Sequence, residues 1–250
     1  MSRIIVTKEQ RASLARDTSR SRPHRVESEN KFDVFPEFIR SAKRFTTILE
    51  EEPPKGLVTV CMGDARDMRT LDDGVVDAVI TSPPYLNAID YLRGHKMLLV
   101  WMGHSIAGLR KIRSSSIGAE RGPDTDVACE IIESVLAGVG EIGKLPRRHQ
   151  RMVERYVCDL YSLMKEVSRV MRAHGQATFV VGNSCLRGVF VRNSGGVAKA
   201  AEMNGLCLVD ETERDLPDLS RSLPMMNDEA NALSKRMRTE NVMVFERMVA

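Results

Sequence analysis

The chain has 250 residues, of which 42% are hydrophobic and 28% are charged, a composition typical of one globular domain with a sizeable core or of two small ones. Lys and Arg outnumber Asp and Glu by 37 to 34, and a net charge of +3 is too small to identify a polyanionic partner by itself. No stretch approaches the ~18 consecutive apolar residues of a membrane span, and the first ten residues hold no secretory apolar core. We therefore expect a cytoplasmic protein that is neither secreted nor embedded in a membrane.

The cysteines are odd in number and contain no CxxC pair, which favours reduced core residues over disulfides. They are Cys61, Cys129, Cys158, Cys185 and Cys207. Four histidines show no metal-ligand spacing relative to these cysteines, so no metal site is expected. These histidines are His95, His104, His149 and His174.

The chain begins with a mildly basic segment, residues 1–31, which holds eight Lys or Arg against four acidic residues and few large apolar side chains. We expect a flexible arm there and one domain over residues 32–250. Apolar residues at helical spacing predict an amphipathic helix over 33–50, before Pro53 and Pro54. Residues from about 105 to 145 are rich in Ser, Gly and charge, and we expect a loop-rich insertion with one short helix at 127–139.

Beyond the insertion, the most regular helical pattern lies at 146–175, where one face is apolar and Gly175 follows as a stop signal. That face carries Met152, Val153, Tyr156, Val157, Leu160, Met164, Val167 and Met171. A short helix is expected at 196–205. Apolar runs predict a strand between Gly56 and Gly63, a second within 71–80 after a turn, and three more at 176–184, 206–216 and 240–248. Alternating strands and helices, with runs too apolar for a half-exposed sheet, predict an α/β fold with a mainly parallel sheet.

The most specific feature is Ser82-Pro83-Pro84-Tyr85, which follows the apolar run at 77–81. Ligands of open parallel sheets bind beyond the carboxyl ends of the strands, which is where this tetrapeptide is expected. The two prolines fix their own φ angles and restrict the residue before each of them, so the backbone is stiff before a ligand arrives. Neither proline has an N–H group, and their carbonyls remain as acceptors.

The residues on either side of the prolines suit a nucleobase. Ser82 supplies a hydroxyl that accepts or donates a hydrogen bond, and Tyr85 supplies a flat ring on which a base stacks. Two acceptors that take the two hydrogens of an exocyclic amine would pull its nitrogen towards tetrahedral geometry and free the lone pair for attack. A rigid strand-to-helix turn is the alternative, but Ser-Pro-Pro-Tyr arises by chance in only about one in a thousand chains of this length.

With these residues in view, the sequence resembles the amino-methyltransferases of DNA, which transfer a methyl group from S-adenosylmethionine to N6 of adenine or N4 of cytosine. The shared features are "GDARDM", "VVDAVITSPPY", "RVMRAHGQATFVVGN" and "ENVMVFER", in the family's order from about residue 57 to 247. The resemblance implies a Rossmann-like methyltransferase fold. A Ser at the first position of the tetrapeptide is commonest in the cytosine-N4 enzymes.

By the same resemblance, Ser82 and the Pro83 carbonyl would hold the target amine, and Tyr85 would stack on the base after it is flipped out of the duplex. Pro84 would complete the rigid turn, and Asp64 would lie near the adenine of S-adenosylmethionine. DNA is then the expected partner.

The chain departs from the family at the cofactor loop, because no strand is followed by Phe-x-Gly-x-Gly. The segment "LAGVGEIG" follows a helical pattern instead, so we interpret it as a helix end and turn. We therefore expect the sheet to be incomplete, with its first strands missing from this chain. The chain is then either one part of a split or truncated methyltransferase or a non-catalytic DNA-binding partner subunit, with a second chain or a homodimer covering the open sheet edge. RNA or another planar amine is a further candidate substrate.

Basic residues outside this turn suit phosphate contacts, although solvated loops are the alternative. The first group is Arg110, Lys111, Arg113 and Arg121, among serines. The second group, expected near the base-binding side, is Arg214, Arg221, Lys235, Arg236 and Arg238.

Overall fold

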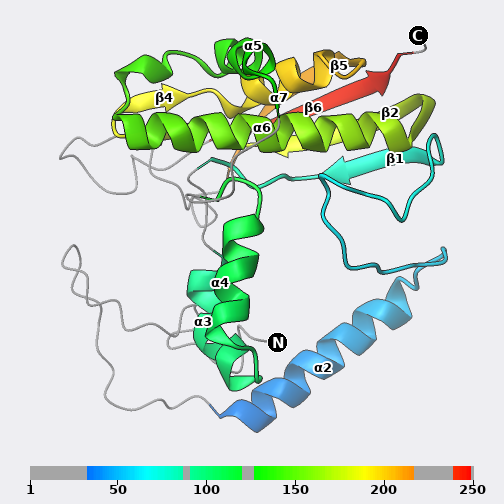
Figure 1. The fold of residues 1–250 in the computed structure, drawn as a ribbon. Coiled ribbons are helices and arrows are strands. Elements are labelled where there is room, and N and C mark those ends of the chain that lie inside the picture. Colours follow the sequence, from blue (N-terminus) through cyan, green and yellow to red (C-terminus); the bar gives the residue numbers. More distant parts are fainter. Residues whose placement is uncertain (1–32, 87–90, 120–126, 217–238, 249–250) are drawn as a thin grey trace. The chain divides into compact units, whose positions relative to one another are not determined.

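The computed structural model describes residues 33–86, 91–119, 127–216 and 239–248, and Figure 1 shows the elements that they form. The chain divides into two compact units. Met1–Cys61 and Asp90–Arg113 belong to a helical unit, and Met62–Ile89 and Ser114–Ala250 belong to a sheet unit. The predicted arm over 1–31 lies outside the described residues.

The helical unit contains α2 (Val34–Glu51), α3 (Tyr91–Trp101) and most of α4 (Ile106–Ser115). The helix predicted over 33–50 is confirmed as α2, which begins after Asp33, whose carboxylate accepts the Phe35 N–H at 3.3 Å. The loop expected after residue 105 is wrong for α4. There Ser105 Oγ accepts the Gly108 N–H at 3.0 Å, and Leu109 is buried, so capping and one apolar face outweigh a composition rich in Ser and Gly.

The sheet unit is built on four strands in the order β1-β2-β6-β5. They are β1 (Val76–Thr81), β2 (Met171–Val181), β6 (Thr239–Arg247) and β5 (Leu206–Asp215). β1 runs parallel to β2, while β6 runs antiparallel to both β2 and β5. Three of these strands therefore point the same way and β6 opposes them, which confirms an α/β fold. The hairpin of β3 (Ser184–Leu186) and β4 (Val189–Val191) forms a separate small sheet.

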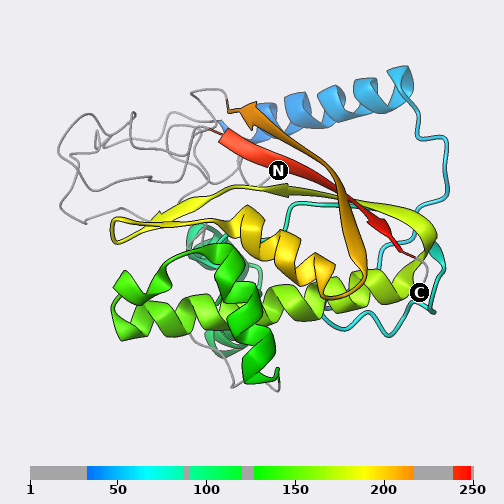
Figure 2. The ribbon, with the colours of Figure 1, turned by 90° about the horizontal axis from the view of Figure 1, so that it is seen from above.

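Helices α5 (Cys129–Val139), α6 (Arg147–Val170) and α7 (Asn193–Glu202) lie on one face of this sheet (Figure 2). A single turn of 3-10 helix, η2 (Ile142–Lys144), precedes α6. The helices predicted at 127–139 and 196–205 are thereby confirmed. The helix predicted over 146–175 is confirmed as far as Val170 and wrong for 171–175, because Met171 pairs with Val76 of β1 and begins β2, so Gly175 lies in a strand. Every residue of the predicted apolar face is buried, including Met171. That face packs on Phe179 of β2 and Phe245 of β6, whose rings meet edge to face with centroids 5.8 Å apart.

Helices α5 and α7 cross at two glycines. A Cβ atom on Gly138 would lie 2.6 Å from the carbonyl oxygen of Gly195, so a side chain there would force the two helices apart. Gly140 follows the end of α5 with a φ of 113°, a conformation that favours glycine. The helix end predicted for "LAGVGEIG" is thus confirmed at Gly140, and the close packing at Gly138 is an addition that the sequence does not reveal.

The strand predicted between Gly56 and Gly63 is wrong. Residues 57–62 belong to no strand, the side chains of Leu57, Val58, Val60 and Met62 are exposed, and Asp64 and Asp67 form only an isolated bridge. An apolar run becomes a strand only where another strand offers its backbone, and within the described ranges none pairs with this one. β1 likewise has β2 as its only neighbour among the described strands.

The expectation that the cysteines are core residues holds for Cys158 and is wrong for Cys61, Cys129 and Cys207, which are exposed free thiols. Cys61 lies within the segment that forms no strand, Cys129 begins α5, and Cys207 lies on the exposed strand β5. In the part of the chain that the structure describes, no helix is long and apolar enough to cross a bilayer.

Candidate functional site

The Ser-Pro-Pro-Tyr turn lies where the sequence predicts it, directly after the carboxyl end of β1. Ser82 is exposed, Pro83 is buried, and Pro84 and Tyr85 are half-buried. Leu86 is completely buried in the core and fixes the far end of the turn. The stiff proline pair is thus held between a strand and a buried anchor, with the exposed Ser82 before it and the half-buried Tyr85 after it.

The hydroxyl of Ser82 is committed as a donor and retains acceptor capacity. Its Oγ lies 3.0 Å from the carbonyl oxygen of Val180, on the neighbouring strand β2. A carbonyl only accepts, so the Ser82 hydrogen goes to Val180. The lone pairs of Ser82 Oγ are then directed at any donor that approaches the turn.

The hydroxyl of Tyr85 is oriented by a carboxylate in the same way. Tyr85 Oη lies 3.2 Å from Ser82 Oγ and 3.3 Å from Oε1 of Glu240, the second residue of the last strand β6. A carboxylate also only accepts, so the Tyr85 hydrogen points at Glu240. Arg214 of β5 holds the other oxygen of Glu240 at 2.8 Å, and Glu240 is 13% exposed. The ring of Tyr85 is therefore tied to two further strands.

Beneath the turn lies Tyr156 of α6, a completely buried residue that shares the core cluster with Leu86. Burial raises the pKa of Tyr156, with a smaller contribution from Tyr85, so this phenol stays neutral. The site therefore rests on a rigid apolar support.

Asp64 lies on a loop that is attached to α6 one helical turn beyond Tyr156. Its carboxylate accepts hydrogen bonds from Arg66, from the backbone N–H at 2.9 Å and from Nη2 at 2.6 Å. Arg66 also pairs with Asp159 of α6 at 2.5 Å and with the carbonyl of Ser115. The hydrogen bond from the Arg66 side chain lowers the pKa of Asp64. Asp64 is thus ionised and already engaged by a cation.

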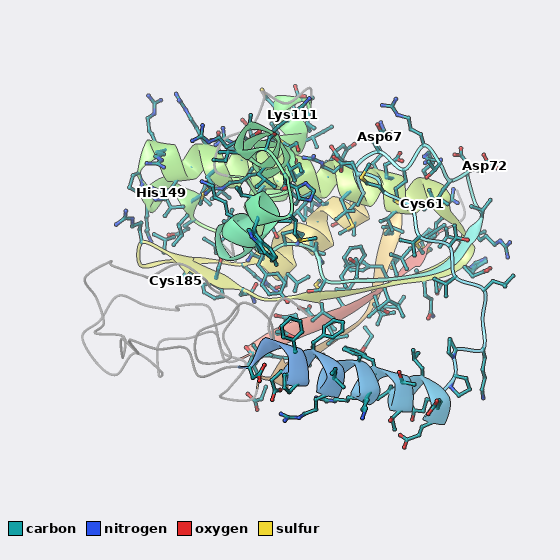
Figure 3. The ribbon with its side chains drawn as sticks, turned by 90° about the horizontal axis from the view of Figure 1, so that it is seen from below. Cys61, Asp67, Asp72, Lys111, His149 and Cys185 are labelled. Atoms are coloured by element: carbon teal, nitrogen blue, oxygen red, sulfur yellow. The ribbon has the colours of Figure 1, made fainter. Side chains whose placement is uncertain are left out.

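The structure describes four of the basic residues predicted to contact phosphates. Arg110, Lys111 and Arg113 lie exposed on α4, in the helical unit; Figure 3 labels Lys111. Arg214 is engaged by Glu240. The remaining predicted residues lie outside the described ranges, and they are Arg121, Arg221, Lys235, Arg236 and Arg238.

Glu240 is the residue of this site that the sequence alone does not reveal. It stands at the start of an ordinary apolar strand, 155 residues from Tyr85, and no local motif marks it. Only the antiparallel placement of β6 beside β2 brings it to the turn.

No family model matches the chain, and no curated protein matches it significantly. Three solved structures of a candidate DNA modification methylase from Thermus thermophilus are similar in fold. A selenomethionine derivative is 13% identical with a TM-score of 0.40, covering 75% of this chain and 52% of its own. The complex of that protein with S-adenosylmethionine and a further structure are each 12% identical, with TM-scores of 0.41 and 0.37, and each match covers 76% of this chain and 53% of theirs. The chain thus spans about half the length of the proteins it matches, and its function is argued from the site itself.

Proposed function

We propose that the chain provides the substrate side of a site-specific DNA methyltransferase, which transfers a methyl group from S-adenosylmethionine to the exocyclic amine of a flipped base, N4 of cytosine in particular. One observation carries the proposal. At the end of β1, the Ser82 hydroxyl donates its hydrogen to the Val180 carbonyl and is exposed as an acceptor. It lies next to Tyr85, whose hydroxyl donates to Glu240.

Each residue of the turn has a role that its surroundings support. Ser82 Oγ and the Pro83 carbonyl accept the two hydrogens of the amine, and in the described structure no donor occupies that carbonyl. The ring of Tyr85 stacks on the base. Glu240 acts through Tyr85 as a positioning residue, because it fixes the direction of the phenol.

S-adenosylmethionine would supply an electrophilic methyl group, but the described residues do not complete a site for it. The segment "LAGVGEIG" is the part of the sequence most similar to a cofactor loop. Its Gly138 lies where α5 crosses α7, and its Gly140 lies where α5 ends. Asp64, the residue expected near the adenine, is bound by Arg66. No step is therefore derived through the cofactor.

A second function, a DNA-binding partner subunit or one part of a split methyltransferase, is favoured by this same mismatch. In the described sheet, β1 is an edge strand and the side chain of Ile80 is 82% exposed. Such an edge invites pairing with strands from a second chain or a second copy. The cofactor loop would then come from that partner.

The test measures transfer of a radiolabelled methyl group to DNA by the full chain, and mass spectrometry of the product nucleosides separates N4-methylcytosine from N6-methyladenine. We expect Ser82→Ala to lower the rate about 100-fold or more, as loss of one well-placed polar contact does in other enzymes. Tyr85→Ala should lower it further than Tyr85→Phe, which keeps the stacking face. Ser162→Ala on α6 is the matched control and should leave the rate unchanged.

Three outcomes discriminate between the hypotheses. Methylation that survives Ser82→Ala combined with Tyr85→Ala would refute the proposed site. No binding of S-adenosylmethionine at millimolar concentration would favour the partner subunit over a self-sufficient enzyme. Faster methylation of RNA than of DNA of the same sequence would replace DNA as the substrate.

A further inference from the structure

The amino end of α6 carries an unusual concentration of positive charge. Arg147, Arg148 and Arg151 are exposed within its first turn and a half, the first turn has no acidic residue, and no side chain caps the helix. Cations at the amino end of a helix oppose its dipole and are unfavourable by a few tenths of a kcal/mol each. A sequence that breaks a local rule in this way points to a role other than stability.

The hairpin of β3 and β4 extends the positive charge. Arg187 stands at the tip of this hairpin with a φ of 52°, and Arg192 follows β4, where its N–H bonds the Val139 carbonyl at 2.9 Å. A shallow hollow beside η2 is lined by Lys144, Gly188 and Arg192, among others. Figure 3 shows His149 of α6 and Cys185 of β3 at the same end of the sheet unit.

These arginines differ from most others of the sheet unit in having no acidic partner. Among the described residues, no carboxylate forms an ion pair with Arg147, Arg151, Arg187 or Arg192, whereas Arg66, Arg169, Arg172 and Arg214 each hold at least one. The nearby Glu141 pairs with Lys144 instead. We call Arg147, Arg151, Arg187 and Arg192 the basic surface.

The basic surface lies on the same side of the sheet unit as the Ser-Pro-Pro-Tyr turn. Helix α6 leads directly into β2 and runs against the direction of β1 and β2, so its amino end lies beyond their carboxyl ends (Figure 1). Tyr156 of α6 packs under the turn. At a rise of about 1.5 Å per residue, Arg151 and Arg147 lie about 8 and 14 Å further along the helix axis.

Those separations correspond to about two to four nucleotides of a strand, at about 3.4 Å each. We propose that the basic surface binds the phosphates of the nucleic-acid strand that flanks the base held at Ser82 and Tyr85. This inference rests on the proposed function for the identity of the base but adds a contact surface outside the turn. Exposed guanidinium groups with no carboxylate partner suit phosphate oxygens, which they bind through paired hydrogen bonds.

The experiment measures the affinity of the full chain for a fluorescent DNA duplex of about 20 base pairs at several salt concentrations. Arg147→Gln with Arg151→Gln removes two charges from the basic surface. Each lost phosphate contact should reduce the slope of log K against log salt by about 0.9, so we expect a decrease of about two. Arg69→Gln with Arg172→Gln removes the same charge from ion-paired residues at the other end of the sheet unit and should leave the slope unchanged.

An unchanged slope in the Arg147/Arg151 variant, or an equal decrease in the Arg69/Arg172 control, would overturn the inference. Ser82→Ala with Tyr85→Ala should bind the duplex with the wild-type slope, because phosphate contacts do not depend on the base. A variant that loses methylation but keeps the salt slope of DNA binding therefore tests the proposed function. A variant that changes only the salt slope tests the basic surface. Tighter binding to phosphatidylserine vesicles than to DNA would assign the surface to a membrane and also overturn the inference.

Discussion

The two halves of α6 use the same kinds of charged residue in opposite ways. In the carboxyl half, Arg169 pairs with Glu166 and Asp73 and donates to the carbonyls of Met68 and Leu71. In the amino half, Arg147 and Arg151 face solvent with no carboxylate partner among the described residues. The carboxyl half of the helix fixes a loop of its own chain, whereas Arg147 and Arg151 in the amino half are exposed and accessible to an external anion.

The engaged half has a structural consequence for the site. Residues 64–75 lie along α6, held by Arg66 on Asp159, by Glu166 on the Met68 N–H at 2.7 Å, and by backbone bonds from Gly74 and Val75 to the end of the helix. This loop leads directly into β1 and therefore sets where the Ser-Pro-Pro-Tyr turn begins. Charge pairing in this half stabilises the fold, whereas Arg147 and Arg151 of the other half carry the proposed phosphate contacts.

The largest effect on stability is expected for Glu166→Ala. The change leaves the Met68 N–H without its acceptor and removes one of the two carboxylates that pair with Arg169, and Glu166 is only 15% exposed. Loss of hydrogen bonds to a charged group should lower the free energy of unfolding by about 2 kcal/mol. Urea unfolding followed by circular dichroism measures this loss.

The matched control is Glu154→Ala in the amino half of the same helix. The side chain of Glu154 has no ion pair or hydrogen bond within the described structure, so the change should stay within about 0.5 kcal/mol. Equal losses in the two variants would show that the two halves of α6 do not differ in their contribution to stability.

The next largest effect is expected from acid, which should lower the stability contributed by the ion pairs at the carboxyl half of α6. Hydrogen bonds from Arg66 and Arg169 lower the pKa values of Asp64 and Glu166 below those of free carboxyls. A lowered pKa in the folded state contributes stability that is present above the ordinary carboxyl pKa of about 4 and is lost as the pH falls through the lowered value. We expect the urea midpoint to fall between pH 6 and pH 3, and to fall less in Glu166→Ala. A wild-type midpoint independent of pH over that range would contradict this.

The fold was predictable from the sequence wherever a local pattern and its tertiary surroundings agreed. The apolar face of α6 is buried as its spacing indicates, and β1, β5 and β6 form at their predicted runs, whereas β2 begins at Met171, five residues before the predicted strand. The run from Leu57 to Met62 looks equally apolar but forms no strand, because a strand also needs a neighbour and the local sequence does not contain one. Residues 106–115 show the opposite error, because a loop was predicted and a helix forms. One capping serine and the buried Leu109 stabilise that helix although its composition disfavours it.

The residues of the candidate site also fall into those that a local sequence pattern predicts and those that depend on the tertiary structure. Ser82 to Tyr85 were predictable because a rigid proline pair after a strand is a local signal with a fixed position in an α/β fold. Glu240 was not, because its contact with Tyr85 depends on the pairing of β6 with β2 far away in the sequence. The unpaired arginines of α6 were visible as residues, but their lack of partners is a property of the folded chain alone.

The smallest expected effect is an increase in stability, whereas the change in the carboxyl half of α6 lowers stability. Arg147→Glu places a negative charge in the first turn of α6, where the helix dipole favours it, and no described ion pair is broken. The free energy of unfolding should rise by about 0.5 kcal/mol, while the affinity for duplex DNA at low salt should fall. Lys43→Glu, in the middle of α2, should leave stability nearly unchanged because the dipole acts only near helix ends. A loss of stability in Arg147→Glu would mean that this arginine supports the fold, and the contrast between the two halves of the helix would then fail.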